Sequence, residues 1–269
     1  MVMATKTYDA DLYHRAAAGW SAGAELVYQP LAHALVAVSP MPLADRCILD
    51  LGAGTGAGSR ALQAVGAIPI AVDLALAMLR HDRALRPPAV VADVRRLPFA
   101  AGAADGALAP FVLNHVDQPV LVLGEVARGV RPGGVVLAST FSDADRPPVK
   151  ELVDAVAIQH GWTPPPSYVW LKDHALDLLG SAGRMADAAT AAGLVDVTVT
   201  EGPVEVGVSS VRDLVAFRLG MAHLSDFLAS RSEDDRAALV AEAEAAVAQR
   251  HDGSDLAPSV VFLAARVAG

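Results

Sequence analysis

The stretch Cys47-Ile-Leu-Asp-Leu-Gly-Ala-Gly-Thr-Gly-Ala-Gly58 decides the fold of this chain. An apolar run ends in Asp50, and glycines follow at alternate positions, Gly52, Gly54 and Gly56. This pattern predicts a buried strand that enters a glycine-rich turn, from which a helix begins. Because glycine has no Cβ, such a turn lets a ligand approach the backbone closely. It also presents the ligand with the unpaired N–H groups of the helix start.

Strand and helix patterns alternate along the first half of the chain. Such alternation with short connections is typical of a parallel sheet with helices on both of its faces. Two later apolar stretches are also strand-like, so we expect a Rossmann-like α/β fold: a doubly wound, mostly parallel seven-stranded sheet with a helical cap. The predicted strands cover residues 47–51, 69–72, 90–92, 106–113, 135–140, 195–200 and 260–267.

The rest of the chain is predicted to add helical pieces to this core. Residues 211–250 have the pattern of two helices, and the second begins at Ser232, whose hydroxyl can cap it. Residues 162–168 contain three consecutive prolines and are predicted to be irregular. We expect four parts in chain order: N-terminal cap helices at 1–45, a core that contains the glycine-rich turn and its ligand site at 46–207, a helical cap insertion at 208–252 and a final core strand at 253–269.

Length and composition limit the classes of protein. The 269 residues are 53% apolar, enough for one large domain with a sizeable core, and the formal net charge is −9. A negative chain without a basic block repels nucleic acid. No apolar stretch approaches the length of a membrane helix, and the N-terminus has no apolar signal core. We therefore expect a cytoplasmic monomer or homodimer with no nucleic-acid or membrane partner, and the single cysteine, Cys47, excludes an internal disulfide.

Three carboxylates indicate which ligand the turn holds. Asp50 precedes the glycines, where it would repel a pyrophosphate and attract an ammonium group, directly or through water. Asp73 ends the second predicted strand and can accept hydrogen bonds from two ribose hydroxyls. Asp93 ends the third and can accept from an exocyclic adenine amine. Ammonium, ribose and adenine without phosphate describe S-adenosylmethionine. The alternative is that Asp73 and Asp93 only cap the helices that follow them.

These residues and their neighbours resemble the class I S-adenosylmethionine-dependent methyltransferases, and within them the small-molecule group of ubiquinone/menaquinone-type enzymes. The resemblance is close over residues 46–142 and looser beyond. The motifs that carry it are Ile48-Leu-Asp-Leu-Gly-Ala-Gly-Thr-Gly56, Ala71-Val-Asp-Leu74, Ala92-Asp93 with Leu97-Pro-Phe99, Phe111-Val-Leu-Asn-His-Val116 and Arg131-Pro-Gly-Gly134.

The resemblance implies a role for each matching residue. The glycine turn would pack against the methionine and ribose portion, Asp50 would help to fix the amino group, and Asp73 would bind the ribose. Leu74 would stack on adenine, and the segment 111–114 would lie near the sulfonium. The implied cofactor-binding residues are Asp50, Gly52, Ala53, Gly54, Thr55, Gly56, Asp73, Leu74, Asp93, Val94, Phe111 and Asn114.

Methyl transfer needs alignment of donor and acceptor and, for an oxygen acceptor, a base. His115, after the fourth predicted strand, is one candidate for a catalytic base, although it could instead tie its loop to the backbone. His14, in the N-terminal segment, is the other candidate, and His223 in the predicted cap stays open. No Cys/His/Asp grouping has metal-ligand spacing, so no metal site is expected.

The added helices are expected to select the acceptor. Their apolar and aromatic residues suit a small organic acceptor, with a secondary metabolite as one candidate, although the same residues could simply bury the lid. Two other hypotheses remain: an enzyme of this fold that does not methylate, such as a cyclase with a structural cofactor, and a non-enzymatic binding protein. The residues concerned are Trp20, Tyr28, Phe217, Met221 and Phe227, with Trp162, Tyr168 and Trp170 nearby.

Overall fold

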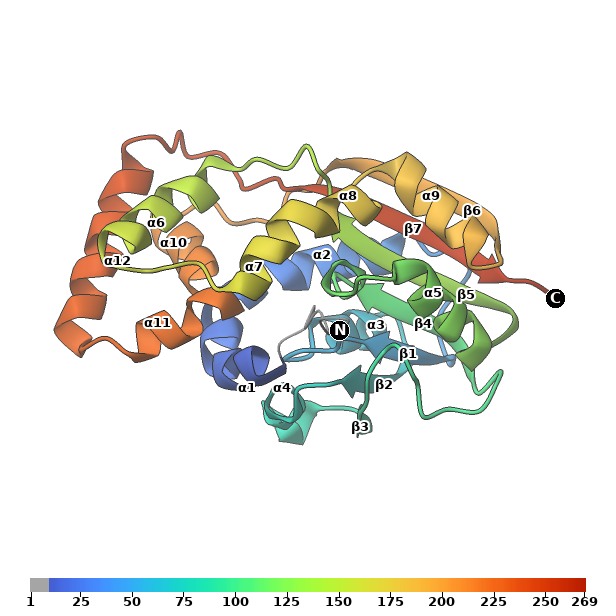
Figure 1. The fold of residues 1–269 in the computed structure, drawn as a ribbon. Helices are drawn as coiled ribbons and strands as arrows, with labels where there is room; N and C mark the ends of the chain where they lie inside the picture. Colours follow the sequence, from blue (N-terminus) through green and yellow to red (C-terminus); the bar gives the residue numbers. More distant parts are fainter. Residues whose placement is uncertain (1–9) are drawn as a thin grey trace, which may run out of the picture.

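The computed structural model describes residues 10–269, so the part of the predicted N-terminal cap at residues 1–9 lies outside the described residues. One seven-stranded sheet has the order β3-β2-β1-β4-β5-β7-β6, and only β7 runs antiparallel to its neighbours (Figure 1). The predicted doubly wound, mostly parallel sheet is confirmed. The strands are β1 Cys47–Leu51, β2 Ile68–Asp73, β3 Ala89–Val91, β4 Ala104–Pro110, β5 Val130–Phe141, β6 Leu194–Pro203 and β7 Ser259–Val267.

Helices fill the connections and form the cap. The α-helices are α1 Ala10–Gly19, α2 Glu25–Ala37, α3 Ala57–Ala64, α4 Leu76–Arg80, α5 Pro119–Gly129, α6 Pro148–Gln159, α7 Pro166–Trp170, α8 Leu176–Leu179, α9 Ala182–Ala191, α10 Val211–Leu219, α11 Ser225–Ala229 and α12 Glu233–Ala248. Tighter or wider turns join them: the π-helices η1 Trp20–Ala24 and η4 Leu171–Ala175, and the 3-10 turns η2 Arg83–Leu85, η3 Leu113–His115 and η5 Ala222–Leu224.

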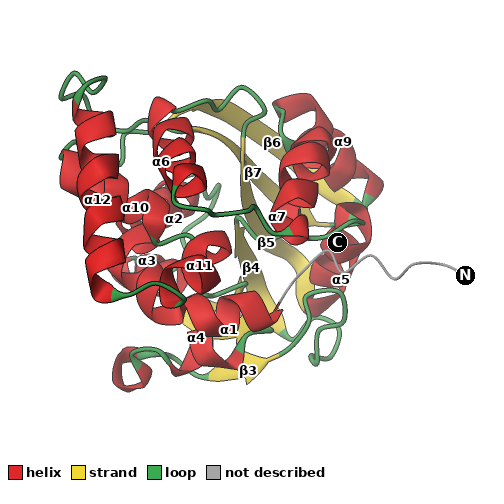
Figure 2. Ribbon diagram, turned by 60° about the vertical axis from the view of Figure 1, so that its left-hand side comes forward, coloured by secondary structure: helices red, strands yellow, loops and turns green. Residues whose placement is uncertain are grey.

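Alternate residues of the central strands build two cores. On β1, Ile48 points into a core shared with α2, α3, α6 and the cap helices α10 and α12, while Leu49 points into a core shared with α5 and α9. Val135 and Val136 of β5 divide in the same way. Figure 2 shows α6, α10 and α12 on one side of the sheet and α5 and α9 on the other. Burial on both faces explains why the strand sequences are continuously apolar.

Two predictions for the second half are wrong in detail. Helix α7 begins at Pro166, within the stretch that we expected to be irregular. Proline is tolerated at the first helical position because that N–H has no helical partner, so the last of the three prolines starts a helix instead of preventing one. Residues 211–250 form three α-helices, not two, because the chain turns through η5 into α11 before α12 begins. The predicted cap is present: the Ser232 hydroxyl accepts from the Asp235 amide at 3.1 Å.

The N-terminal segment and the cap insertion dock through two glycines. A Cβ on Gly23 would lie 2.0 Å from the Ala216 carbonyl oxygen of α10, and one on Gly220 would lie 2.6 Å from the Ala24 nitrogen. Backbone therefore meets backbone where η1 crosses the end of α10. Figure 1 also shows α1 beside α4, at the β2 and β3 edge of the sheet. Among the described residues, no helix is both long and apolar enough to cross a membrane.

Replacing Gly23 by alanine should destabilise the protein by about 1–3 kcal/mol, because the added methyl group collides with a backbone carbonyl that cannot move alone. Gly124→Ala on α5 is the matched control, since nothing lies within 4 Å of its Cβ position. In a helix interior alanine is favoured over glycine by up to about 1 kcal/mol, so this control should raise stability. Chemical denaturation measures both. Equal effects of the two substitutions would contradict the close approach.

Candidate functional site

The glycine-rich turn has the backbone that its sequence predicted. Gly52, Gly54 and Gly56 all adopt positive φ, at 65°, 51° and 111°, in the region that glycine tolerates best. Asp73 at the end of β2 holds the turn: its carboxylate accepts from the Gly54 amide at 2.8 Å and from the Ala75 amide at 2.8 Å. The ends of β1 and β2 are thereby fixed together at one edge of the sheet.

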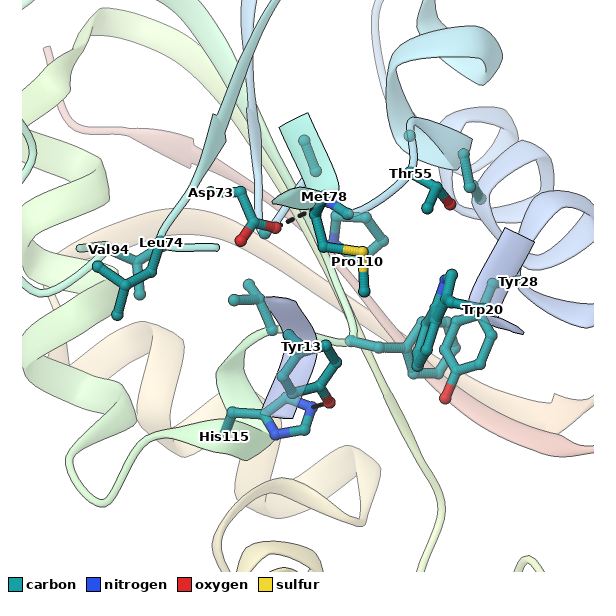
Figure 3. A pocket seen from close by; sticks show the side chains of 18 of the residues that line it. Tyr13, Trp20, Tyr28, Thr55, Asp73, Leu74, Met78, Val94, Pro110 and His115 are labelled. Carbon is teal, nitrogen blue, oxygen red and sulfur yellow. Dashed lines mark hydrogen bonds between the residues drawn. The ribbon is translucent and has the colours of Figure 1, made fainter. Parts of the chain in front are cut away.

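A first cavity lies against this turn and runs along the carboxyl ends of the parallel strands. Leu74 and Val94 lie together at one end of it, and Trp20 and Tyr28 at the other, with Asp73 between (Figure 3). Most of the predicted cofactor-binding residues line this cavity. They are Gly52, Ala53, Gly54, Thr55, Asp73, Leu74, Asp93, Val94 and Phe111.

Asp93 lines the cavity, but its carboxylate already has a partner. Both oxygens accept from the Arg95 guanidinium, at distances down to 2.6 Å. These bonds hold the pKa of Asp93 below its ordinary value. The Asp93 carboxylate thus lies at the cavity, as predicted. An adenine amine that donates to it would share this carboxylate with the Arg95 guanidinium.

Asp50, predicted to fix the amino group, is instead buried beneath the turn. It has no exposed surface, and one oxygen accepts from the Ser59 hydroxyl at 2.6 Å. The other oxygen has no hydrogen-bond partner among the described residues. A Cβ at position 58 would lie 2.3 Å from this second oxygen, so only a glycine at this position leaves room for the Asp50 carboxylate. Burial raises the pKa of Asp50 to about 6, and its role toward a ligand stays a prediction.

Asp50→Asn should change how stability depends on pH. Because the pKa of the folded carboxyl, about 6, lies above the ordinary value of 3.8, the folded protein binds more protons than the unfolded chain between these values. The stability that protonated Asp50 contributes is complete below pH 3.8 and is lost as the pH rises through 6. The loss amounts to about 3 kcal/mol.

The measurement is the free energy of unfolding at about pH 5 and about pH 7.5. Asp50→Asn should lose less stability between these two pH values than the wild type does. Asp187→Asn, at an exposed position of α9, is the control and should follow the wild type. If Asp50→Asn shows the wild-type slope, the carboxyl is not titrating in this window.

The fourth strand ends earlier than predicted, and this places the candidate base. β4 stops at Pro110, and Phe111 has a φ of 54°, an uncommon conformation for an aromatic residue. The chain then turns through η3, which brings His115 to the cavity. Phe111 is kept in place by Phe141, with ring centroids 4.6 Å apart, and by the edge of Tyr28 at 5.2 Å.

His115 is half-buried and packs against Tyr13 of α1. The Tyr13 hydroxyl lies 3.3 Å from His115 Nε2, and the two rings meet edge to face (Figure 3). Burial lowers the pKa of His115 to about 4 and raises the pKa of Tyr13. At neutral pH the imidazole is therefore uncharged and carries a nitrogen lone pair, as a general base requires.

A second cavity of about 300 Å³ adjoins the first. Tyr13, Tyr28 and His115 line both, so these three side chains form the boundary between them. The other walls of the second cavity come from the end of β5, from α6 and α7, and from the α10–η5 segment. Asn114 lies here and not in the first cavity, whereas the resemblance placed it near the sulfonium.

Two other predicted residues lie outside both linings. Gly56 lies next to the guanidinium of Arg60. His14, on α1, interacts electrostatically with Asp73 but lines neither cavity. Of the two candidate bases only His115 lines the cavities, and the role of either residue as a base stays a prediction. Residue spacing did not reveal Tyr13, Lys150 or Arg218 as parts of the site. They come from elements far apart in the chain, and only the fold brings them together.

Comparison with known proteins assigns the core. A family model described as a methyltransferase domain matches residues 49–138. This range contains the glycine turn, Asp73, Asp93 and His115. These residues form a class I S-adenosylmethionine-dependent methyltransferase domain. S-adenosylmethionine is the cofactor of this family.

The similarity to curated relatives is confined to the same region. A demethylmenaquinone methyltransferase of Mycobacterium sp. (strain KMS) is 40% identical over 95 residues, which cover 35% of this chain and 41% of the relative. A demethylmenaquinone methyltransferase of Corynebacterium kroppenstedtii is 37% identical over 95 residues, 35% of this chain and 42% of the relative. The chain thus spans about two fifths of the length of the relatives it matches.

Solved structures show that the fold similarity extends further. A phosphoethanolamine N-methyltransferase 2 of Haemonchus contortus, in complex with S-adenosyl-L-methionine, has a TM-score of 0.55 at 19% identity, covering 89% of this chain and 52% of that one. The cyclase SpnF has a TM-score of 0.53 at 17% identity, covering 89% and 81%. The same fold therefore supports more than one reaction.

The residues present fit the cofactor of the family. Asp73 is 4% exposed and lines the cavity. It accepts two backbone bonds, which leaves lone pairs for ribose hydroxyls. Leu74 and Val94 provide apolar surface for an adenine ring at one end of the cavity, and the glycine turn lets the remainder of the ligand contact the backbone.

Asp73→Ala should weaken the binding of S-adenosylmethionine about tenfold or more, because the ribose loses its acceptor and the Gly54 amide loses its anchor. Titration calorimetry measures the change. Asp187→Ala, on the exposed face of α9, is the control and should bind as the wild type does. An unchanged affinity in Asp73→Ala would remove Asp73 from the cofactor site.

Proposed function

We propose that the protein transfers the methyl group of S-adenosylmethionine to a small organic acceptor. In this proposal the first cavity holds the donor and the second holds the acceptor. The observation that carries it is the boundary between the cavities, which Tyr13, Tyr28 and His115 line from both sides. Donor and acceptor held on either side of one boundary are positioned for an in-line displacement.

The cofactor supplies an activated methyl group on a sulfonium. The bond from sulfur to the methyl carbon breaks with its electron pair retained on sulfur, and a bond from the acceptor atom to that carbon forms. An acceptor that begins as O–H or N–H must also lose a proton. His115 is placed to take it, since its ring is neutral and lies at the boundary. Tyr13 orients this ring through its hydroxyl.

The size and walls of the second cavity support a small acceptor. Its volume of about 300 Å³ suits a compact organic molecule, and Phe141, Tyr168 and Phe217 supply aromatic surface. Residues that were expected on the lid are divided between the two cavities: Trp20 lines the first, and Met221 lines the second. Trp162 lines neither cavity, and its ring packs against the ring of His223.

The test is transfer of a labelled methyl group from S-adenosylmethionine to a panel of small acceptors. Wild-type protein should yield a labelled product and S-adenosylhomocysteine in equal amounts. His115→Asn should lower kcat by about one hundredfold or more for an oxygen acceptor, because general-base catalysis is lost. Its affinity for the cofactor should change little.

His14→Asn, at the other candidate base, is compared in the same assay. A larger loss of kcat in His14→Asn than in His115→Asn would transfer the role to His14. A product that forms without label would contradict methyl transfer and favour the cyclase-like alternative, in which the cofactor is structural. No product from any acceptor, with cofactor binding intact, would favour a binding protein.

A further inference from the structure

The second cavity contains buried polar atoms that no protein group satisfies. His223 is 8% exposed, and its Nε2 has no hydrogen-bond partner among the described residues. Asn114 is 9% exposed, and its Oδ1 is likewise without a partner there. Both side chains line the second cavity. Burying a polar atom without a partner costs free energy, so a ligand that supplies the partners recovers this free energy.

The His223 ring is fixed in place. It stacks on Tyr168 with ring centroids 3.8 Å apart and planes 14° apart, and Trp162 lies against it at 5.8 Å. The backbone carbonyl of His223 accepts from the Trp162 indole N–H at 3.3 Å. The stacking fixes the plane of the ring and therefore the directions in which its nitrogens can make hydrogen bonds.

Basic side chains surround this ring. Burial, followed by the charges of Arg218, Lys172 and, more weakly, Lys150, keeps the pKa of His223 well below its ordinary value. The imidazole of His223 is therefore uncharged, at a place where the surrounding charge is positive. An anion bound there would be attracted by the basic side chains and would also favour a proton on the ring, which then becomes a donor.

The acidic residues of the cavity do not balance this charge. Asp154 holds Arg218 through two bonds of 2.6 and 2.7 Å, and Asp145 holds Lys150 at 2.5 Å. Among the described residues, no carboxylate lies within 4.0 Å of the Lys172 ammonium group. Like the Arg218 guanidinium, this ammonium group lies over the ring of Tyr168.

The ionisable residues that line the second cavity carry a net positive formal charge, although the net charge of the whole protein is −9. The basic residues are Arg146, Lys150, Lys172 and Arg218, and the acidic ones are Asp145, Glu151 and Asp154.

We propose that the acceptor is a planar, ring-containing molecule with an anionic group, such as a carboxylate, that His223 and Lys172 bind. Its ring would lie among Tyr28, Phe141 and Phe217, and its methyl-accepting atom would lie beside His115. The Asn114 carboxamide oxygen would accept a hydrogen bond from the acceptor. This proposal rests on the proposed function, since it assigns the second cavity to the acceptor.

Binding of matched probes tests the proposal without requiring turnover. The full chain is saturated with S-adenosylhomocysteine. Titration calorimetry then compares planar carboxylates with their neutral amides: para-hydroxybenzoate with para-hydroxybenzamide, and a hydroxynaphthoate with its hydroxynaphthamide. We expect at least one carboxylate to bind about tenfold or more tightly than its amide, because hydrogen bonds to charged groups are the stronger ones.

Variants of the cavity should remove this preference. His223→Gln and Lys172→Gln should each weaken carboxylate binding about tenfold, with the amide affected less than about twofold. Arg212→Gln is the matched control, since it removes a positive charge from an exposed position of the same helix as Arg218. Wild-type affinity for S-adenosylhomocysteine and a wild-type unfolding transition show that each variant is folded.

The outcomes separate this proposal from the proposed function. Equal binding of carboxylate and amide, failure of every carboxylate to bind, or a preference that survives both cavity substitutions would overturn the anionic acceptor. Methyl transfer to neutral acceptors would still stand in that case. A carboxylate preference that depends on His223 and Lys172, in a protein that transfers no label, would support the anion site and overturn methyl transfer.

Discussion

The carboxylate of Asp73 is the interaction on which the cofactor end of the molecule depends. It joins the Gly54 amide, in the turn after β1, to the Ala75 amide after β2. Without it, a turn made of glycines with positive φ would have few contacts to hold one conformation, because glycine loses more conformational freedom on folding than other residues. The same carboxylate faces the cavity, so one side chain both builds the site and offers it an acceptor.

The acceptor side depends on a different constraint, the approach of two segments about two hundred residues apart in the chain. Gly23 and Gly220 let η1 and α10 touch through their backbones. This contact sets Tyr28, from the N-terminal side, opposite Phe217 and Met221, from the cap. The arrangement is tertiary throughout, so the shape of the second cavity is a property of how the cap docks on the core.

This difference explains which features could be predicted from the sequence. The bounds of β1 were predicted to the residue, and the turn and Asp73 were placed correctly at the strand ends, because strand periodicity and glycine conformation are local. Asp93 lies just beyond the end of β3, at Val91, and not at the strand end itself. The prediction from sequence failed where tertiary packing determines the conformation of the chain. β4 stops early because Phe111 turns the chain with positive φ, and α7 starts on a proline. Asp50 is buried under Gly58, a contact between a strand and the following helix that spacing alone did not reveal.

The half-buried His115 and the buried His223 interact electrostatically. The low pKa of His115, about 4, makes it a weak base at neutral pH. A negative charge brought into the same region of low dielectric raises the pKa of a neighbouring imidazole. His115 is among the groups whose charge acts on His223, so the two rings lie within electrostatic range of each other. An anionic acceptor would therefore strengthen the base at the moment when its proton has to be removed. The cavity, rather than the net charge of the chain, governs this effect, because solvent ions screen surface charges beyond about 8 Å and screen buried groups much less.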